Sequence, residues 1–481
     1  MPRSLAVCFR MPVRIAAICT VALLCATASV RGQDDVLPTN GMESLKAERK
    51  KHQDLATDLL RGFRVADPKD QSHVEALDWQ AKYDTYRFTW VPLQQKPGEL
   101  HAVYQGGVAA AVANLTKGKP GTSGAVSIYA SKVIEHALEV LKSGRLVARV
   151  NAAQALVKLA ELGPPEMAEA LTVVLQDPNQ SEAVKFHIAH AMQVLQQQNP
   201  PAVPQEQEKK AAEALANFID RKMIIADTTK REEVEGFRYV RREGIRALAQ
   251  FRNPGAAPSG LGALTLLRVV AKDGLVPPPR LDERVDAACG VARLKPALDP
   301  QYNPDYAIAQ IGLFLEEFNR EATSAREQLQ ESKGPSRFAW KVMASELYDA
   351  IDQMRVECAD NAYVVTLANA CLKLLAQLEK GQPADPEEIL RIVAATPPPS
   401  KRLFKNVEDS TVRAANRRDN QDAALPAPPQ LETKPLAPPG GNGKPAAAPG
   451  APADKGKPAS PFAPTDKSKP SVPDPGTKPK Q

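Results

Sequence analysis

The stretch Val147-Ala-Arg-Val-Asn-Ala-Ala-Gln-Ala-Leu-Val-Lys-Leu159 predicts an amphipathic helix. Its apolar residues recur three and four positions apart, which places them on one face of a helix. Gly163-Pro164-Pro165 ends this helix, because proline lacks the N–H that would continue it. Two further apolar segments follow, 167–175 and 183–195, and Asp177-Pro178 separates them. The region therefore predicts two helical hairpins of one repeating kind.

A register of small and long residues extends this pattern along the chain at intervals of 36, 56 and 43 residues. Small residues let two helices approach closely, and the long residues fill the groove between them. The copies are Ala155-Leu156 with Leu159, Ala191-Met192 with Leu195, Ala247-Leu248 with Phe251, and Gly290-Val291 with Leu294. Six positions before each small residue stands a basic one, to which we assign a structural role: Arg149, Lys185, Arg241 and Arg284.

This register resembles the HEAT-like, armadillo-type helical repeats, whose second helix carries a basic residue ahead of an Ala-Ala-x-Ala-Leu-like core. The resemblance covers residues 127–297. It implies an all-α fold, a right-handed α-solenoid of HEAT-like helical hairpins, which presents an extended surface to a protein partner. An ordinary bundle of alanine-rich helices is the alternative interpretation. The resemblance identifies no partner, since one fold serves many functions.

Composition divides the chain into five segments. Pattern, aromatic content and proline content change at each boundary. The segments are a signal peptide (1–32), an N-terminal helix with an aromatic-rich irregular segment that caps the solenoid (33–126), the HEAT-like repeats (127–300), a C-terminal helical bundle or divergent repeats (301–396), and a disordered Pro/Ala/Lys-rich tail (397–481).

The first segment has the features of an export signal. Arg3, Arg10 and Arg14 precede an apolar run of 16 residues at 15–30, which is too short to span a bilayer comfortably. Ala26-Thr27-Ala28 supplies a small-x-small cleavage site. We expect an exported protein with no stable membrane span, located in the periplasm, the cell envelope or outside the cell. A retained anchor is the alternative, and translation starts at Met1 or Met11.

The distribution of charge argues against nucleic-acid binding. The chain is +6 overall, residues 1–32 carry four arginines without an acid, and residues 401–481 are +6, so residues 33–400 are about −4. A nucleic-acid-binding body is expected to carry a basic face of its own. The basic character of this chain belongs to its two ends.

Four aromatic residues mark a candidate binding segment near the N-terminus: Trp79, Tyr83, Tyr86 and Trp90. Exposed aromatic rings stack on sugars and prolines, so one interpretation is a platform for a polysaccharide or a peptide. The other is that these rings cover the end of the solenoid, whose last apolar face must be closed. The alternation in residues 86–91 predicts a short strand or an extended segment.

The polar residues form no constellation that specifies a reaction. His187 and His190 lie three apart on one predicted helix, but zinc requires further Cys, His, Asp or Glu ligands, so packing is the preferred interpretation. We expect no catalytic site, no metal and no cofactor. Cys289, Cys358 and Cys371 remain after signal removal, and Cys358 and Cys371 lie too far apart in a helical hairpin to form a disulfide.

Four amphipathic segments follow the repeats, at 305–332, 338–358, 362–378 and 385–394. The first is long enough to dimerise as a coiled coil, but its heptads are not sustained. The tail holds 19 of the 43 prolines and recurrent Lys-Pro pairs, a composition that cannot bury enough apolar surface to fold.

The leading hypothesis is an exported, non-enzymatic scaffold that binds a protein or peptide partner along the helical surface. Its tail acts as a spacer or envelope tether, or is a solubilising segment without a partner. A protein that binds an anionic envelope polymer through the tail and the aromatic residues is the alternative, and a solenoid-fused enzyme is a third.

Overall fold

The computed structural model describes residues 41–117, 122–198, 203–332, 339–395, 397–398 and 400–412. The expected signal peptide and most of the expected tail lie outside this set. All described residues belong to one compact unit, Met1–Pro426. They form an all-α structure with a single isolated β-bridge between Tyr302 and Phe404. No helix within the described ranges combines the length and apolar character needed to cross a membrane.

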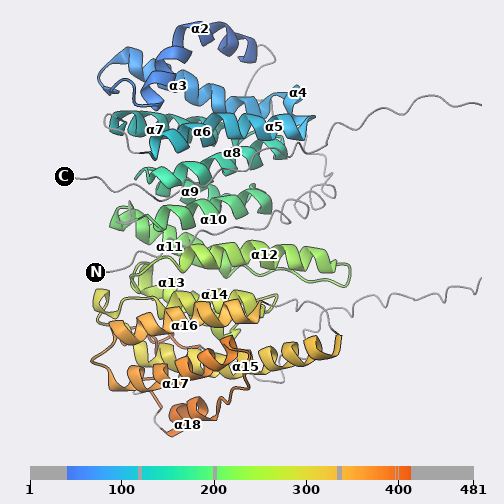
Figure 1. Cartoon of the computed structure of the whole chain (residues 1–481), viewed down its shortest axis with the longest axis vertical. Coiled ribbons are helices and arrows are strands. Elements are labelled where there is room, and N and C mark those ends of the chain that lie inside the picture. The colour runs from blue at the N-terminus through green and yellow to red at the C-terminus, as the bar shows by residue number, and fades with distance from the viewer. Residues whose placement is uncertain are drawn as a thin grey trace, which may run out of the picture. The chain divides into compact units, whose positions relative to one another are not determined.

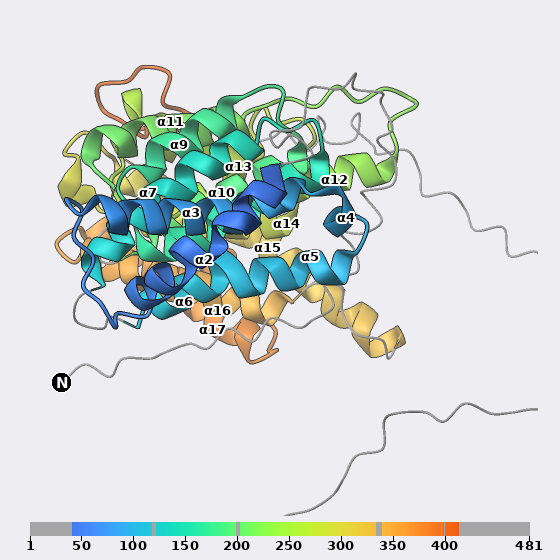
Figure 2. The ribbon, with the colours of Figure 1, turned by 90° about the horizontal axis from the view of Figure 1, so that it is seen from above.

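The centre of the unit consists of two rows of helices, and each helix packs on the next one in its own row. Figure 1 follows these helices in chain order, and Figure 2 shows α9, α11 and α13 over one another with α10 and α14 beside them. The first row contains α7 (Ser123–Val140), α9 (Met167–Gln176), α11 (Gln205–Ile219), α13 (Leu261–Ala271) and α15 (Pro304–Ser332). The second row contains α8 (Leu146–Leu159), α10 (Glu182–Gln196), α12 (Arg231–Leu248), α14 (Leu281–Ala292) and α16 (Trp340–Glu357).

Helices that follow one another in the chain also pack in pairs across the two rows. These pairs are α7 with α8, α9 with α10, α11 with α12 and α13 with α14. The register residue Gly290 and Gly244, which stands three positions before Ala247, lie in close helix contacts, Gly244 across the rows and Gly290 within the second row. A Cβ on Gly244 would lie 2.8 Å from the ring of Phe218, and one on Gly290 would lie 2.7 Å from the Cβ of Ala249. The prediction that small residues permit close helix approach is therefore confirmed at these two positions.

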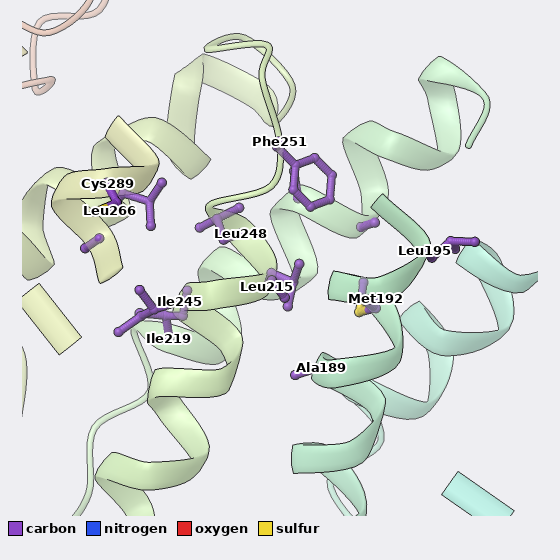
Figure 3. Packing of buried hydrophobic residues seen from close by; sticks show 14 of the residues in the cluster. Ala189, Met192, Leu195, Leu215, Ile219, Ile245, Leu248, Phe251, Leu266 and Cys289 are labelled. Atoms are coloured by element: carbon purple, nitrogen blue, oxygen red, sulfur yellow. The ribbon is translucent and has the colours of Figure 1, made fainter. Parts of the chain in front are cut away.

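The apolar core runs between the rows without interruption. Figure 3 shows one part of it, where Met192 and Leu195 of α10, Leu215 and Ile219 of α11, and Ile245 and Leu248 of α12 pack together, with Leu266 and Cys289 following from α13 and α14. Cys289, Cys358 and Cys371 are buried free thiols, and the last two are not bonded to one another.

Local sequence sets the helix ends. Gly163 adopts a left-handed conformation (φ 64°) and ends the short 3₁₀ turn η4 (Ala160–Leu162) that extends α8. The Ser181 side chain accepts a hydrogen bond from the N–H of Val184 and begins α10 directly after Asp177-Pro178. These are the breaks that the sequence indicates.

The described N-terminal residues form helices joined by loops and contain no strand, which corrects one expectation. Residues 86–91 form no strand: they end α3 and continue into the 3₁₀ turn η2, because the chain there packs against α8 rather than against another strand. The elements are α2 (Gly41–Leu60), α3 (Gln71–Tyr86), η2 (Arg87–Thr89), α4 (Val91–Gln94), α5 (Pro97–Tyr104), the π-helical turn η3 (Gln105–Ala109) and α6 (Ala110–Leu115).

The pairing of helices changes at the C-terminal end. Here α15 packs on α17 (Ala362–Glu379) and α18 (Glu387–Ala395), whereas α16 pairs with α14 and α17. The expected start of the disordered tail at residue 397 is wrong, since residues 400–412 fold back against the body and bury Leu403, Phe404 and Val412. This short segment packs against residues that lie about 100 positions earlier in the chain.

Candidate partner-binding surface

The four aromatic residues singled out in the sequence lie at the junction of α2 and α3. Trp79 is only 3% exposed, and its indole N–H donates to the backbone oxygen of Leu45. Its ring stacks on Tyr83 with centroids 5.2 Å apart. Tyr83, Tyr86 and Trp90 are partly buried against the same cluster, and the Lys46 ammonium lies 4.6 Å from the Trp90 ring. The platform interpretation is wrong for Trp79, because its faces are covered by this chain.

A polar network joins α3 to α7 beside these rings. His136 is buried, with Nε2 2.8 Å from Asp78 and Nδ1 3.2 Å from the hydroxyl of Tyr86, which donates to Glu139. Burial alone would raise the pKa of Asp78, but the hydrogen bonds from His136 and Lys82 lower it to about 2. Burial and Glu139 raise the pKa of Tyr86. Each of these polar side chains has a hydrogen-bonding partner within the network, so the network fixes the packing of α3 on α7.

Two basic residues of the register contact neighbouring elements. Arg241 and Glu283 are both fully buried and form a bidentate pair at 2.7 and 3.2 Å, while Arg241 also donates to the backbone oxygen of Pro277. Arg284 donates to the backbone oxygen of Val270 and pairs with Glu317 at 2.7 Å. Arg241 thus links α12 to α14, and Arg284 links α14 to α13 and α15.

The two earlier register residues make weaker contacts. Arg149 donates to the backbone oxygen of Asn179 at 3.3 Å, in the loop before α10. Lys185 is 6% exposed, and burial together with the nearby Arg221 lowers its pKa. The four residues therefore share a position in the register but not one set of partners.

A second set of ion pairs, here termed the charged ladder, crosses the second row on the side of α12 that holds Arg242 and Arg246. Arg242 pairs with Asp282 at 2.7 Å and with Asp286 at 2.5 Å, and Arg246 pairs with Asp286 at 2.9 Å. Since each carboxylate of α14 receives a guanidinium from α12, the arginine side chains are held in place. The ladder consists of His190, Glu235, Arg238, Arg242, Glu243, Arg246, Arg280, Asp282 and Asp286.

The ladder continues to α10 through His190, whose Nδ1 lies 2.5 Å from Glu243. This bond raises the pKa of His190, whereas burial lowers the pKa of His187 to about 4. His187 instead lies 3.4 Å from the amide of Gln154 on α8. The two histidines thus have separate partners, and no group of three metal-binding side chains occurs within the described residues.

An aromatic pair lies beside the ladder. Phe186 of α10 stacks on Tyr239 of α12, with centroids 5.0 Å apart and planes 12° apart, and Tyr239 remains 44% exposed. We define the aromatic–arginine patch as Phe186, His190, Tyr239, Arg242 and Arg246. Positions 239, 242 and 246 are three and four apart and therefore share one face of α12. Sequence reasoning missed this patch, because Phe186 and Tyr239 stand 53 positions apart.

Comparison with known proteins supplies no family for the chain. No family model matches it, and no curated protein matches it. The solved structure of an engineered protein is similar to 63% of this chain and 97% of its own length, at 16% sequence identity and a TM-score of 0.30. That similarity is too distant to transfer a function. Across its described residues the chain is an all-α protein whose helices pack in sequence.

Proposed function

We propose that the protein is an exported, non-enzymatic scaffold that binds a protein or peptide partner at the aromatic–arginine patch. In this proposal the two rows of helices form a right-handed α-solenoid of HEAT-like hairpins, and the second row carries the binding surface. The observation that supports it is that the Phe186–Tyr239 stack, of which Tyr239 is exposed and Phe186 partly buried, shares its side of α12 with Arg242 and Arg246. Tyrosine and arginine are enriched among the residues that dominate binding energy at protein interfaces.

The charged ladder supports binding by preorganisation. The arginine side chains of the patch are already held by Asp282, Asp286 and Glu243, so a partner would not have to order them. Ordering a flexible side chain at an interface costs about 0.5–1.5 kcal/mol, and that cost is avoided here. Phe186 and Tyr239 fix one another in the same way.

Export and tethering rest on the sequence alone. The apolar run at 15–30 with its preceding arginines supports export, and the +6 charge of residues 401–481 supports contact with an anionic envelope polymer. The tail then acts as a spacer between that polymer and the scaffold.

Site-specific photo-crosslinking from the full mature chain tests the binding proposal. A photoreactive residue at position 239 is expected to capture a discrete partner from the envelope fraction. The matched control is position 173 on α9, because Val173 is also well exposed, at 61%, but lies in the first row. Capture at both positions, or at neither, would contradict a partner site on the second row.

The tail is tested by a version that ends after Val412, which keeps the packed residues 400–412. Equal capture at position 239 in both versions, with loss of envelope retention at low salt in the shorter one, is the expected result. Unchanged retention would remove the tether from the proposal.

A further inference from the structure

The segment 400–412 occupies a groove made by two loops and the first turn of α15. The backbone of Asn303 donates to the oxygen of Leu403 at 2.8 Å, and Lys405 donates to the oxygen of Gln301 at 2.9 Å. The Asn303 side chain adds bonds to the backbone oxygens of Ser400 and Arg402, at 3.2 and 2.9 Å. The two backbone bonds form the isolated antiparallel bridge between Tyr302 and Phe404, and the Asn303 side chain extends the contact on one side.

The groove has a position for one aromatic ring. Phe404 is 2% exposed and lies 5.8 Å from the ring of Tyr302, centroid to centroid. A Cβ built on Gly260, directly before α13, would overlap the Phe404 ring. Gly260 has φ +66°, so both its conformation and the space above it require glycine. The Phe404 ring therefore occupies space that is open only because residue 260 is glycine.

Two hydroxyl groups close the segment. Ser410 is fully buried: its Oγ accepts from the N–H of Phe404 at 3.0 Å and donates to the oxygen of Val407 at 2.7 Å. At the far end, the N–H of Val412 donates to the hydroxyl of Tyr306 at 3.0 Å, in the first turn of α15. Between Phe404 and Ser410 the side chains are mostly exposed, among them that of Glu408.

We propose that residues 400–412 are an intramolecular latch, a segment folded through turns on itself, whose release opens the first turn of α15 and the loop before it while leaving α8 and α10 folded. The latch contacts residues 100 or more positions earlier, so its closure costs chain entropy that only these contacts offset. Segments of this kind open locally, with free energies below that of global unfolding. The groove fits a segment that begins with Leu403-Phe404. A serine follows six positions after the phenylalanine, at Ser410, and an apolar residue two positions after that serine, at Val412. This device is independent of the partner surface.

Hydrogen–deuterium exchange of the full chain tests the latch. Phe404→Ala is expected to raise amide exchange at 299–306 and 400–412 by about tenfold or more, with no change in α8 and α10. Tyr306→Phe removes only one hydroxyl and is expected to give a smaller rise in the same segments, about fivefold. Glu408→Ala is the matched control, since Glu408 is an exposed residue of the latch itself. Unchanged exchange at Asn303 and Lys405 in both variants would overturn the proposal, as would an equal rise in α8 and α10.

A double-mutant cycle tests the pairing of ring and glycine. Gly260→Ala alone is expected to raise exchange in the latch, because the new methyl group displaces Phe404. In the Phe404→Ala background the same change meets no ring, so its effect is expected to be several-fold smaller. The strain at φ +66° is present in both backgrounds and cancels. Additive effects would show that Phe404 does not lie over Gly260, and would overturn the latch as described.

Discussion

At the scale of single residues, the protein relies on charged groups that are buried in pairs. Arg241 and Glu283 are fully buried, lie 42 positions apart and join α12 to α14. Removing two charges from water is costly, and only close geometry with additional hydrogen bonds offsets that cost. The third contact of Arg241, to the backbone oxygen of Pro277, supplies such a bond.

This pair gives the first prediction. Arg241→Met removes the cationic partner of the buried Glu283 carboxylate, which keeps only uncharged contacts such as that from the N–H of Arg280, so the free energy of unfolding is expected to fall by about 3–5 kcal/mol. Arg241→Met combined with Glu283→Leu removes both charges and is expected to cost far less. Urea unfolding measures both. A double variant no more stable than the single one would show that the pair is not the source of the loss.

The two histidines of α10 give a prediction about pH. The pKa of His190 is raised by Glu243, so its pairing contributes stability below the ordinary value of 6.5, and this contribution is lost as the pH rises through the folded-state pKa. The pKa of His187 is lowered to about 4 by burial, so stability is lost as the pH falls from 6.5 toward 4.

NMR titration of the imidazole signals separates the two effects. His187 is expected to titrate near pH 4 and His190 above 6.5, and Glu243→Gln is expected to lower the pKa of His190 more than that of His187, because only His190 is hydrogen-bonded to Glu243. Two titrations that coincide near 6.5 would contradict the contacts described for α10 and α12.

The buried thiols give a third prediction. Burial raises the pKa of Cys289 and Cys371 to about 12 and that of Cys358 to about 11. Because the thiolate is the reactive form, alkylation of these three residues in the native protein is expected to be slow and to become rapid in denaturant. Mass spectrometry of alkylated peptides measures this at each position. Fast native labelling of Cys289 or Cys371 would show that the helices around them are open.

At the scale of elements, close approach depends on individual glycines, and α12 contains its own control. Gly244 faces the ring of Phe218, whereas a methyl group added at Gly236 would meet no atom within 4 Å. Gly244→Ala is expected to lower the free energy of unfolding by about 1–3 kcal/mol through overpacking. Gly236→Ala is expected to raise it by about 0.5–1 kcal/mol through helix propensity. Urea midpoints that shift in the same direction would contradict the close packing of α11 on α12.

Sequence reasoning succeeded for elements with strong periodicity. The segments predicted at 305–332 and 362–378 correspond to Pro304–Ser332 and Ala362–Glu379, because their apolar spacing and helix-ending residues agree. It failed at residues 86–91, where β-forming aromatic residues are held in helical turns by packing on α8. It also failed at 400–412, where Leu403 and Phe404 are too few to mark a folded segment without knowledge of Gly260 and Tyr302.

The candidate surface was harder to predict from the sequence than the fold. The register identified Arg241 and Arg284, which are buried linkers, but not Arg242 and Arg246 of α12, which are only partly buried. No local pattern distinguishes these neighbours. Only the packing of α12 between α10 and α14 decides which arginine is buried.

At the scale of the whole molecule, each helix of the second row from α8 to α16 packs on the next one in that row, so a continuous surface arises from local contacts. The apolar core and the inner Arg241–Glu283 pair hold the rows together, and the charged ladder orders the side chains on the second row. In the proposed function the Phe186–Tyr239 stack serves binding, whereas the inner Arg241–Glu283 pair serves stability. Variants of the patch are expected to change binding without changing the fold.

The most direct test of this account measures partner capture by the full mature chain carrying Phe186→Ala and Tyr239→Ala together. Capture is expected to fall at least about tenfold, since truncation of an aromatic hot-spot residue costs about 2 kcal/mol or more of binding free energy. A chain carrying Val173→Ala is expected to capture as much as the unmodified protein. Undiminished capture by the double variant, with its helical content intact, would contradict the assignment of function to this surface.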